Sequence, residues 1–292
     1  MIMRIESLCT TQVITSFSGT EITRGTGFLY RFGQTLALVT NWHILSGLSP
    51  ITGLQMPGCV YTPNWVGFHV SVKTTDGYFI APISLPLQSG YGSTWLQHTG
   101  YRDGKGRLRL VDIGVVPLNS LIENQEWIFN EITAFPAQMI YVRDGETGSE
   151  SAENAYARVA TEVFMLRYPK GLTSQGIIPV WKRGSIASEP LFAILDGAPA
   201  FFVDALTRDG MSGAPVLSFS GEITDASGIA IPYAHNEKSS PWLLGVYAGR
   251  EGVTEDEMKM TLGRAWKKQM LDDIFFYGIP GGETLGSDVY AI

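Results

Sequence analysis

The chain has 292 residues, of which 45% are hydrophobic and 17% are charged. This balance is typical of a packed globular protein and excludes an intrinsically disordered chain. The length allows one large core or two modest ones. The formal net charge of −7 argues against a general nucleic-acid-binding protein, which would normally present a basic surface.

Export and membrane signals are not found in the sequence. Residues 1–7 contain no continuous apolar segment followed by a small-residue cleavage site, and no run approaches the roughly 20 apolar residues of a membrane span. Cys9 and Cys59 are the only cysteines, which favours a reducing compartment, although one bridge between them is compatible with the sequence. We therefore expect a cytoplasmic protein that does not bind membranes.

Alternating polar and apolar residues predict β-strands over most of the chain, which we interpret as one folded unit, 1–292. Strands first occupy residues 8–130, and residues 64–86 within them predict a hairpin that turns at Thr75-Asp76-Gly77. Residues 143–151 (RDGETGSES) are polar and turn-rich, which predicts a solvated loop. The strand pattern then resumes over 156–250.

One helix is predicted, over residues 254–278. The segment Thr254-Glu255-Asp256-Glu257 has a capping-box pattern, in which a threonine and a glutamate satisfy otherwise unpaired backbone N–H groups. Apolar residues then recur every four positions and predict one buried face. These residues are Met258, Leu262, Trp266, Met270 and Ile274.

The segment 207–215 (TRDGMSGAP) contains a Gly-x-Ser-Gly-x-Pro turn, which is typical of an acyl-transfer nucleophile. Gly210 permits backbone torsions that let its N–H converge with that of Ser212 on one developing negative charge, as an oxyanion hole requires. A serine hydroxyl is a poor nucleophile at neutral pH, so Ser212 needs a histidine base and a carboxylate to orient that base.

Both partners are found upstream. His43 lies near the end of a β-rich apolar run, 36–45 (LALVTNWHIL). Asp112 is a lone acid within the apolar run 110–118 (LVDIGVVPL), where a buried carboxylate requires a partner such as His43. The chain order histidine, aspartate, serine differs from the orders of subtilisin and of the α/β-hydrolases.

These segments resemble the chymotrypsin-like, or trypsin-fold, serine proteases. The matched segments run from about residue 25 to residue 250, so they span most of the chain. Two further segments, 168–171 (YPKG) and 183–187 (RGSIA), are most similar to those of intracellular bacterial trypsin-like peptidases. The five segments that carry the family resemblance are 25–28 (GTGF), 40–43 (TNWH), 112–115 (DIGV), 210–215 (GMSGAP) and 244–247 (LGVY).

The resemblance implies an all-β fold of two six-stranded antiparallel barrels followed by a C-terminal helix. The first barrel, 8–130, would carry His43 and Asp112, and the second, 156–250, would carry Ser212. The implied activity is that of a serine endopeptidase acting on proteins or peptides, with no metal or organic cofactor. The family also accommodates a regulatory protein partner and pathways such as phage defence.

The resemblance further implies a substrate pocket. Leu206, six residues before the serine, would take the place at the pocket floor where trypsin-type enzymes have an aspartate, so basic residues before the scissile bond should be disfavoured. Small or medium apolar residues are expected there, with acidic residues second if Arg250 lies at the pocket mouth rather than pairing with Asp209 in solvent. The predicted substrate-binding residues are Leu206, Thr207, Tyr247, Ala248, Gly249 and Arg250.

Met211 stands immediately before the serine, where digestive proteases have an aspartate that pairs with a newly freed N-terminal amine. A thioether carries no charge for such an ion pair. The resemblance therefore predicts a site that forms without N-terminal processing, or with help from a partner or substrate.

The same residues allow other interpretations. Taken singly, each triad residue could be structural: a half-buried histidine, a strand-end aspartate and a turn serine. The remaining histidines, His69, His98 and His235, lie in no metal-ligand spacing and are expected to be structural, as is Asp204. An α/β-hydrolase would need glycine at position 214, and Asp225 and His235 follow Ser212 too closely for that fold. The main alternative is a catalytically silent peptide-binding module on a protease fold.

Overall fold

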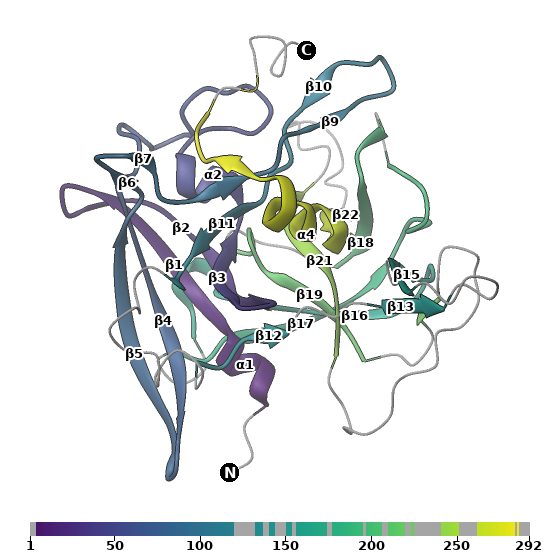
Figure 1. Ribbon diagram of the computed structural model, residues 1–292, viewed down its shortest axis with the longest axis horizontal. Helices are drawn as coiled ribbons and strands as arrows, with labels where there is room; N and C mark the ends of the chain where they lie inside the picture. The colour runs from purple at the N-terminus through teal and green to yellow at the C-terminus, as the bar shows by residue number, and fades with distance from the viewer. Residues whose placement is uncertain are drawn as a thin grey trace.

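The structure is a computed structural model that describes residues 4–119, 132–136, 140–143, 150–153, 156–173, 177–194, 197–205, 210–219, 223–224, 241–250, 262–283 and 285. It is mostly β, with strands in two lobes and a short helix, α4, lying between them in the view of Figure 1. The expected all-β class with a helix late in the chain is therefore confirmed.

The N-terminal lobe is built on a nine-stranded sheet, larger than the expected six-stranded barrel. Its strand path is β23-β8-β11-β3-β2-β1-β4-β5, with β12 pairing in parallel with β2. The strands are β1 Thr10–Phe17, β2 Thr20–Phe32, β3 Thr35–Thr40, β4 Trp65–Thr74, β5 Gly77–Pro86, β8 Leu96–Gln97, β11 Gly114–Pro117, β12 Phe135–Pro136 and β23 Ile279–Pro280.

The predicted hairpin over residues 64–86 is confirmed, because β4 and β5 pair in antiparallel register from Trp65↔Pro86 to Thr74↔Gly77. Strand β3 is almost entirely buried, in agreement with the apolar run 36–39 (LALV) at its centre. Among the described residues, four pairs of short strands lie outside the nine-stranded sheet and the C-terminal barrel. They are β6 Gln88–Ser89 with β7 Gly92–Ser93, β9 Tyr101–Arg102 with β10 Leu108–Arg109, β13 Ile140–Arg143 with β14 Glu150–Glu153, and β15 Tyr156–Ala157 with β20 Ile223–Thr224.

The predicted loop 143–151 has its two ends in β13 and β14, while 144–149 lies outside the described residues.

The C-terminal lobe is a closed six-stranded barrel, as expected. Its order is β16-β17-β18-β22-β21-β19, returning to β16. The barrel extends to residue 267, beyond the predicted limit of 250. Its strands are β16 Glu162–Arg167, β17 Val180–Ile186, β18 Ala200–Asp204, β19 Pro215–Ser218, β21 Trp242–Arg250 and β22 Leu262–Lys267.

The predicted helix 254–278 is wrong over residues 262–267, which form barrel strand β22 instead. The four-residue spacing that suggested one helical face also places Leu262 and Trp266 on one face of a strand, where side chains alternate. The helix itself is α4, Lys268–Tyr277, which buries Met270, Leu271 and Ile274. Residues 251–261, including the predicted capping box, lie outside the described residues.

The other helical segments in the described part of the chain are short: α1 Ile5–Cys9, α2 Trp42–Ser46 and the 3₁₀ turn η2 Pro169–Gly171. A hydrophobic cluster joins the two lobes, because it contains Phe28 and Val115 of the sheet together with Val246 of the barrel and Leu271 and Ile274 of α4. The lobes therefore share one core, and residues from both can be held in fixed positions where they meet.

Candidate active site

His43 lies where buried strand β3 gives way to the five-residue helix α2. The helix ends at Gly47, which adopts a left-handed conformation and donates its N–H to the His43 carbonyl at 3.0 Å. The histidine is only 8% exposed. Its ring is thus carried on a short, fully buried element.

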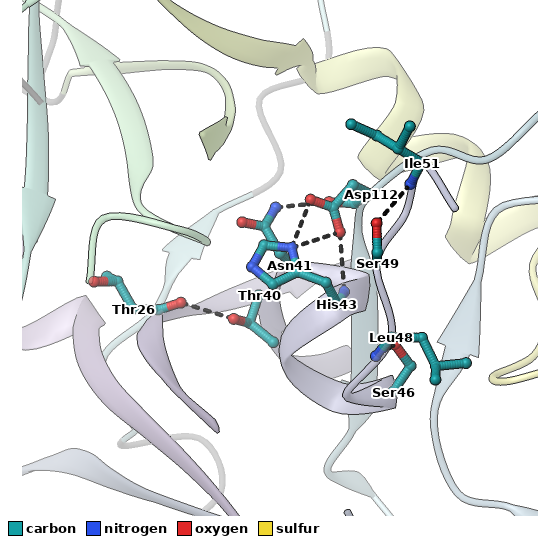
Figure 2. A network of polar contacts seen from close by, with 9 residues as sticks. All are labelled: Thr26, Thr40, Asn41, His43, Ser46, Leu48, Ser49, Ile51 and Asp112. Carbon is teal, nitrogen blue, oxygen red and sulfur yellow. Dashed lines mark hydrogen bonds and ion pairs between the residues drawn. The ribbon is translucent and has the colours of Figure 1, made fainter. Parts of the chain in front are cut away.

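The His43 ring contacts Asp112 directly, as Figure 2 shows. Nδ1 lies 3.0 Å from Oδ1 and 2.8 Å from Oδ2, and the His43 backbone N–H donates to Oδ1 at 2.9 Å. Asp112 is 3% exposed. An ionised carboxylate can only accept hydrogen bonds, so a neutral His43 ring paired with the Asp112 carboxylate has its proton on Nδ1 and its free lone pair on Nε2. This arrangement leaves Nε2 able to accept a proton.

The Asn41 side chain binds the backbone of Asp112. The Asn41 amide nitrogen donates to the Asp112 carbonyl oxygen at 2.6 Å, and both residues are buried. The segment 41–43 therefore bonds residue 112 through a side-chain amide, a backbone N–H and an imidazole. The position of the carboxylate is therefore set relative to the histidine.

Ser212 lies in a turn that the N-terminal lobe holds through Thr26 of β2. The Thr26 N–H donates to the Ser212 carbonyl at 2.8 Å, and the Thr26 hydroxyl donates to the Gly210 carbonyl at 2.9 Å. The Thr40 hydroxyl, three residues before the histidine, donates to the Thr26 carbonyl at 2.7 Å. A chain of hydrogen bonds thus links the serine turn to the strand that carries the histidine.

The barrel holds the other side of the serine turn. The Gly213 N–H donates to the Tyr247 carbonyl, and the Tyr247 N–H donates to the Ala214 carbonyl, each at 2.9 Å. Gly213 has φ of +85°, and a Cβ at this position would lie 2.0 Å from the Thr26 carbonyl oxygen and 2.6 Å from the Thr40 hydroxyl. A side chain does not fit there without moving backbone atoms.

The structure therefore brings His43 and Asp112 into contact and holds the Ser212 turn against the same strands. Gly210, the other predicted oxyanion-hole residue, has φ of +87°, a conformation that glycine adopts without strain. Ser212 itself is partly exposed, unlike the buried residues on both sides of it. The partly exposed serine thus lies in a turn whose backbone is held from both lobes.

The predicted substrate pocket is only partly described. Leu206 and Thr207 lie outside the described residues, as does the side chain of Arg250. The Tyr247 ring is 1% exposed and packs in the barrel core, and Ala248 packs against the shared cluster. Tyr247 positions the serine turn through its backbone, a role that sequence reasoning did not assign.

Three supporting residues were missed at the sequence level: Thr26, Thr40 and Asn41. Each lies inside a segment that carried the family resemblance, but a threonine or asparagine beside a motif has many ordinary roles. Their hydrogen bonds join residues far apart in the chain, so the sequence alone offers no signal for them.

The remaining histidines are described in part. His98 is buried and accepts a hydrogen bond from the Gly100 N–H at 2.9 Å, while its Nε2 lies 3.7 Å from the Asp273 carboxylate. These contacts agree with the predicted structural role. His69 is exposed on β4, and His235 lies outside the described residues. Among the residues with described positions, no three histidine, cysteine or acidic side chains gather into a metal-binding group.

Both cysteines are buried free thiols. Burial raises the pKa of the Cys9 thiol, with a further rise from the nearby charge of Glu6, and burial likewise raises the pKa of Cys59. A thiol with a raised pKa forms little thiolate, so neither cysteine competes with the serine turn as a nucleophile.

In the described part of the chain, no helix has the length and apolar character needed to cross a bilayer.

No protein-family model and no curated protein matches the sequence. Similar folds are found among solved structures. A mutant of Rv3671c from M. tuberculosis in an inactive form is 14% identical, with 96% of this chain and 91% of that chain covered and a TM-score of 0.43. The active form of the same protease is 14% identical, with coverages of 97% and 87% and a TM-score of 0.40.

The serine endoprotease from Yersinia pestis is 10% identical, with 93% of this chain and 62% of that chain covered and a TM-score of 0.41. Identities of this size do not transfer an activity or a residue, so the interpretation of the site rests on its own geometry.

Proposed function

We propose that this protein is a serine endopeptidase of trypsin-like type, in which His43, Asp112 and Ser212 form the catalytic triad. The observation that carries the proposal is the buried contact between the His43 Nδ1 and both carboxylate oxygens of Asp112, at 3.0 and 2.8 Å. An aspartate in this position fixes the ring orientation and favours the tautomer that a general base requires.

In the proposed reaction, Ser212 attacks a peptide carbonyl while the His43 Nε2 takes the hydroxyl proton. The Asp112 carboxylate stabilises the imidazolium that forms, and the N–H groups of Gly210 and Ser212 bind the negatively charged oxygen. The imidazolium then gives its proton to the leaving amine as the C–N bond breaks, which leaves the acyl group bound to Ser212 as an ester, the acyl-enzyme. A water molecule, deprotonated by the same histidine, hydrolyses this ester and regenerates the serine.

The environment of Met211 supports a site that needs no freed N-terminal amine. Met211 is 1% exposed and belongs to the hydrophobic cluster of the barrel, together with Val163, Val216 and Tyr247. An apolar side chain in an apolar cluster has no use for an ammonium partner, which would be costly to bury there. The turn is instead held by the hydrogen bonds from Thr26 and Tyr247.

The proposed substrates are proteins or peptides with a small or medium apolar residue before the scissile bond, and acidic residues as second choice. Leu206 at the pocket floor would disfavour lysine and arginine because it cannot pair with a cation. We further propose a bacterial protein of the cytoplasm with narrow or regulated activity. The two buried, unbridged cysteines support a reducing compartment.

A fluorophosphonate probe tests the function, since it forms a covalent bond only with an activated serine. The wild-type protein should be labelled at Ser212, and the Ser212→Ala variant should not. Mass-spectrometric mapping of cleavage sites in a peptide library then identifies the preferred residue. A folded wild-type protein that neither reacts with the probe nor cleaves the library would favour the silent peptide-binding module. Dominant cleavage after lysine or arginine would contradict the assignment of Leu206.

A further inference from the structure

Gln97, at the end of β8, joins two segments that are far apart in the chain. Its side-chain oxygen accepts hydrogen bonds from the Trp42 indole N–H and from the Gly282 backbone N–H, both at 2.7 Å. Its amide nitrogen donates to the Glu283 carbonyl at 2.9 Å. Gln97 has no exposed surface. A buried amide with partners at both of its polar atoms has one orientation, because rotating it by half a turn would place like groups together.

Residues 279–283, which we call the tail segment, lie beside Gln97. Strand β23 within the tail segment pairs with β8, with Ile279 opposite Gln97. Figure 1 shows this yellow strand running from α4 toward α2. The Gly281 N–H donates to the Trp95 carbonyl at 2.7 Å. A Cβ on Gly281 would lie 2.1 Å from Trp95 Cδ2, so the tail backbone rests directly on the indole ring.

Trp42, at the other end of the connection, is the residue immediately before the proposed base. It is 2% exposed and is the first residue of α2. Because α2 has only five residues, fixing the direction of one large side chain fixes the rotation of the whole helix about its axis. The hydrogen bond from the Trp42 indole to Gln97 therefore acts on the direction in which the His43 ring points.

The same contacts reach the aspartate side of the site. A Cβ on Gly114, two residues after Asp112, would lie 2.7 Å from Leu45 Cδ1 and 3.3 Å from Trp95 Cζ3. The Trp95 ring therefore lies close to the strand that follows Asp112 and to the end of α2. The tail segment contacts the same ring through Gly281.

We propose that Gln97 and the tail segment are positioning elements for the His43 base, acting through Trp42 and Trp95. The inference rests on the proposed peptidase function. It adds that the reactivity of Ser212 depends on a segment some 70 residues further along the chain. Reactivity responds steeply to such positioning, since a displacement of about 1 Å in a catalytic group can cost about 100-fold in rate.

The first test displaces the tail segment without changing Gln97 or α2. Gly281→Ala places a methyl group against the Trp95 ring, while Gly90→Ala adds the same methyl where nothing lies within 4 Å. The fluorophosphonate reaction is followed over a range of probe concentrations. We expect the maximal labelling rate of Gly281→Ala to fall about tenfold or more, with the half-saturating concentration unchanged. Gly90→Ala should label like the wild type.

A purely stabilising tail would give a different result. Gly281→Ala would then have a lower melting temperature but a wild-type labelling rate at temperatures where it remains folded, as judged by circular dichroism. That outcome would overturn the proposal. Failure of the peptidase function itself is distinct, because wild type and Ser212→Ala would then be equally unreactive.

A second test covers the case in which Gly281→Ala does not fold. Gln97→Met keeps an unbranched side chain of similar length but removes the strong acceptor, and Trp42→Phe removes the indole donor. If the hydrogen bond positions the base, each single variant lowers the maximal labelling rate and the double variant is little slower than the slower single one. Independent, multiplying effects would show that the two residues act separately and would overturn the proposal.

Discussion

Replacing Gly213 by alanine tests whether the serine turn depends on close contact between the two lobes. The new Cβ would lie 2.0 Å from the Thr26 carbonyl oxygen and 2.6 Å from the Thr40 hydroxyl. The atom cannot be accommodated by rotating a side chain, because its nearest neighbour is backbone. The turn must therefore move away from β2, and the hydrogen bonds between Thr26 and the turn lengthen or break.

The expected cost has three parts. A non-glycine residue with φ of +85° costs about 1–2 kcal/mol. Inserting a methyl into a filled site adds about 1–3 kcal/mol. Losing one of the hydrogen bonds made by Thr26 adds about 1 kcal/mol. The free energy of unfolding of Gly213→Ala should therefore fall by roughly 3–6 kcal/mol in total.

The matched control is Gly58→Ala, because Gly58 has the same φ of +85° but nothing within 4 Å of a Cβ. The free energy of unfolding of Gly58→Ala should fall only by the cost of the left-handed backbone conformation, about 1–2 kcal/mol. Urea unfolding followed by tryptophan fluorescence gives both free energies. Gly213→Ala should also react at least tenfold more slowly with a fluorophosphonate, while Gly58→Ala should not. Equal free energies of unfolding for the two variants would refute the reasoning.

Three further predictions concern single side chains. Ser212→Ala should lower peptide hydrolysis by about 10⁴-fold or more with an unchanged melting temperature, and retained hydrolysis would exclude Ser212 as nucleophile. Asp112→Asn should lower kcat/KM by about 10⁴-fold because the amide favours the wrong imidazole tautomer, and an unchanged value would remove Asp112 from the site. Although burial would raise the pKa of the Asp103 carboxyl, hydrogen bonds from Arg107 and Arg109 among others hold it well below its usual range. The Asp103 carboxylate therefore stabilises the fold at pH values above the ordinary carboxyl pKa near 4, and this stabilisation is lost as the pH falls further. Asp103→Asn should have a lower melting temperature than the wild type at pH 7, and the difference should shrink below about pH 4. A deficit that is the same at pH 3 and pH 7 would contradict this assignment.

Much of the local structure was predictable because it depends on neighbouring residues. The alternation of side chains and the Thr75-Asp76-Gly77 turn determine the β4–β5 hairpin, and the apolar run before His43 determines a buried strand. The expectation that Asp112 needs a partner also followed from one physical fact, the cost of burying an unpaired charge. That reasoning named His43, and the structure places the two side chains in contact.

Tertiary contacts decided what local pattern left open. Apolar residues spaced by four suit both a helix and a strand, and the barrel made residues 262–267 a strand because pairing with β18 and β21 closes the sheet. The N-terminal lobe became a nine-stranded sheet because β12 and β23 join it from later parts of the chain. The hydrogen bonds between Thr26 and the serine turn and between Trp42 and Gln97 could not be predicted from the sequence either, because each joins residues at least 55 positions apart. The sequence shows which residue types are present, whereas the packing of the two lobes against each other determines which of these residues come into contact.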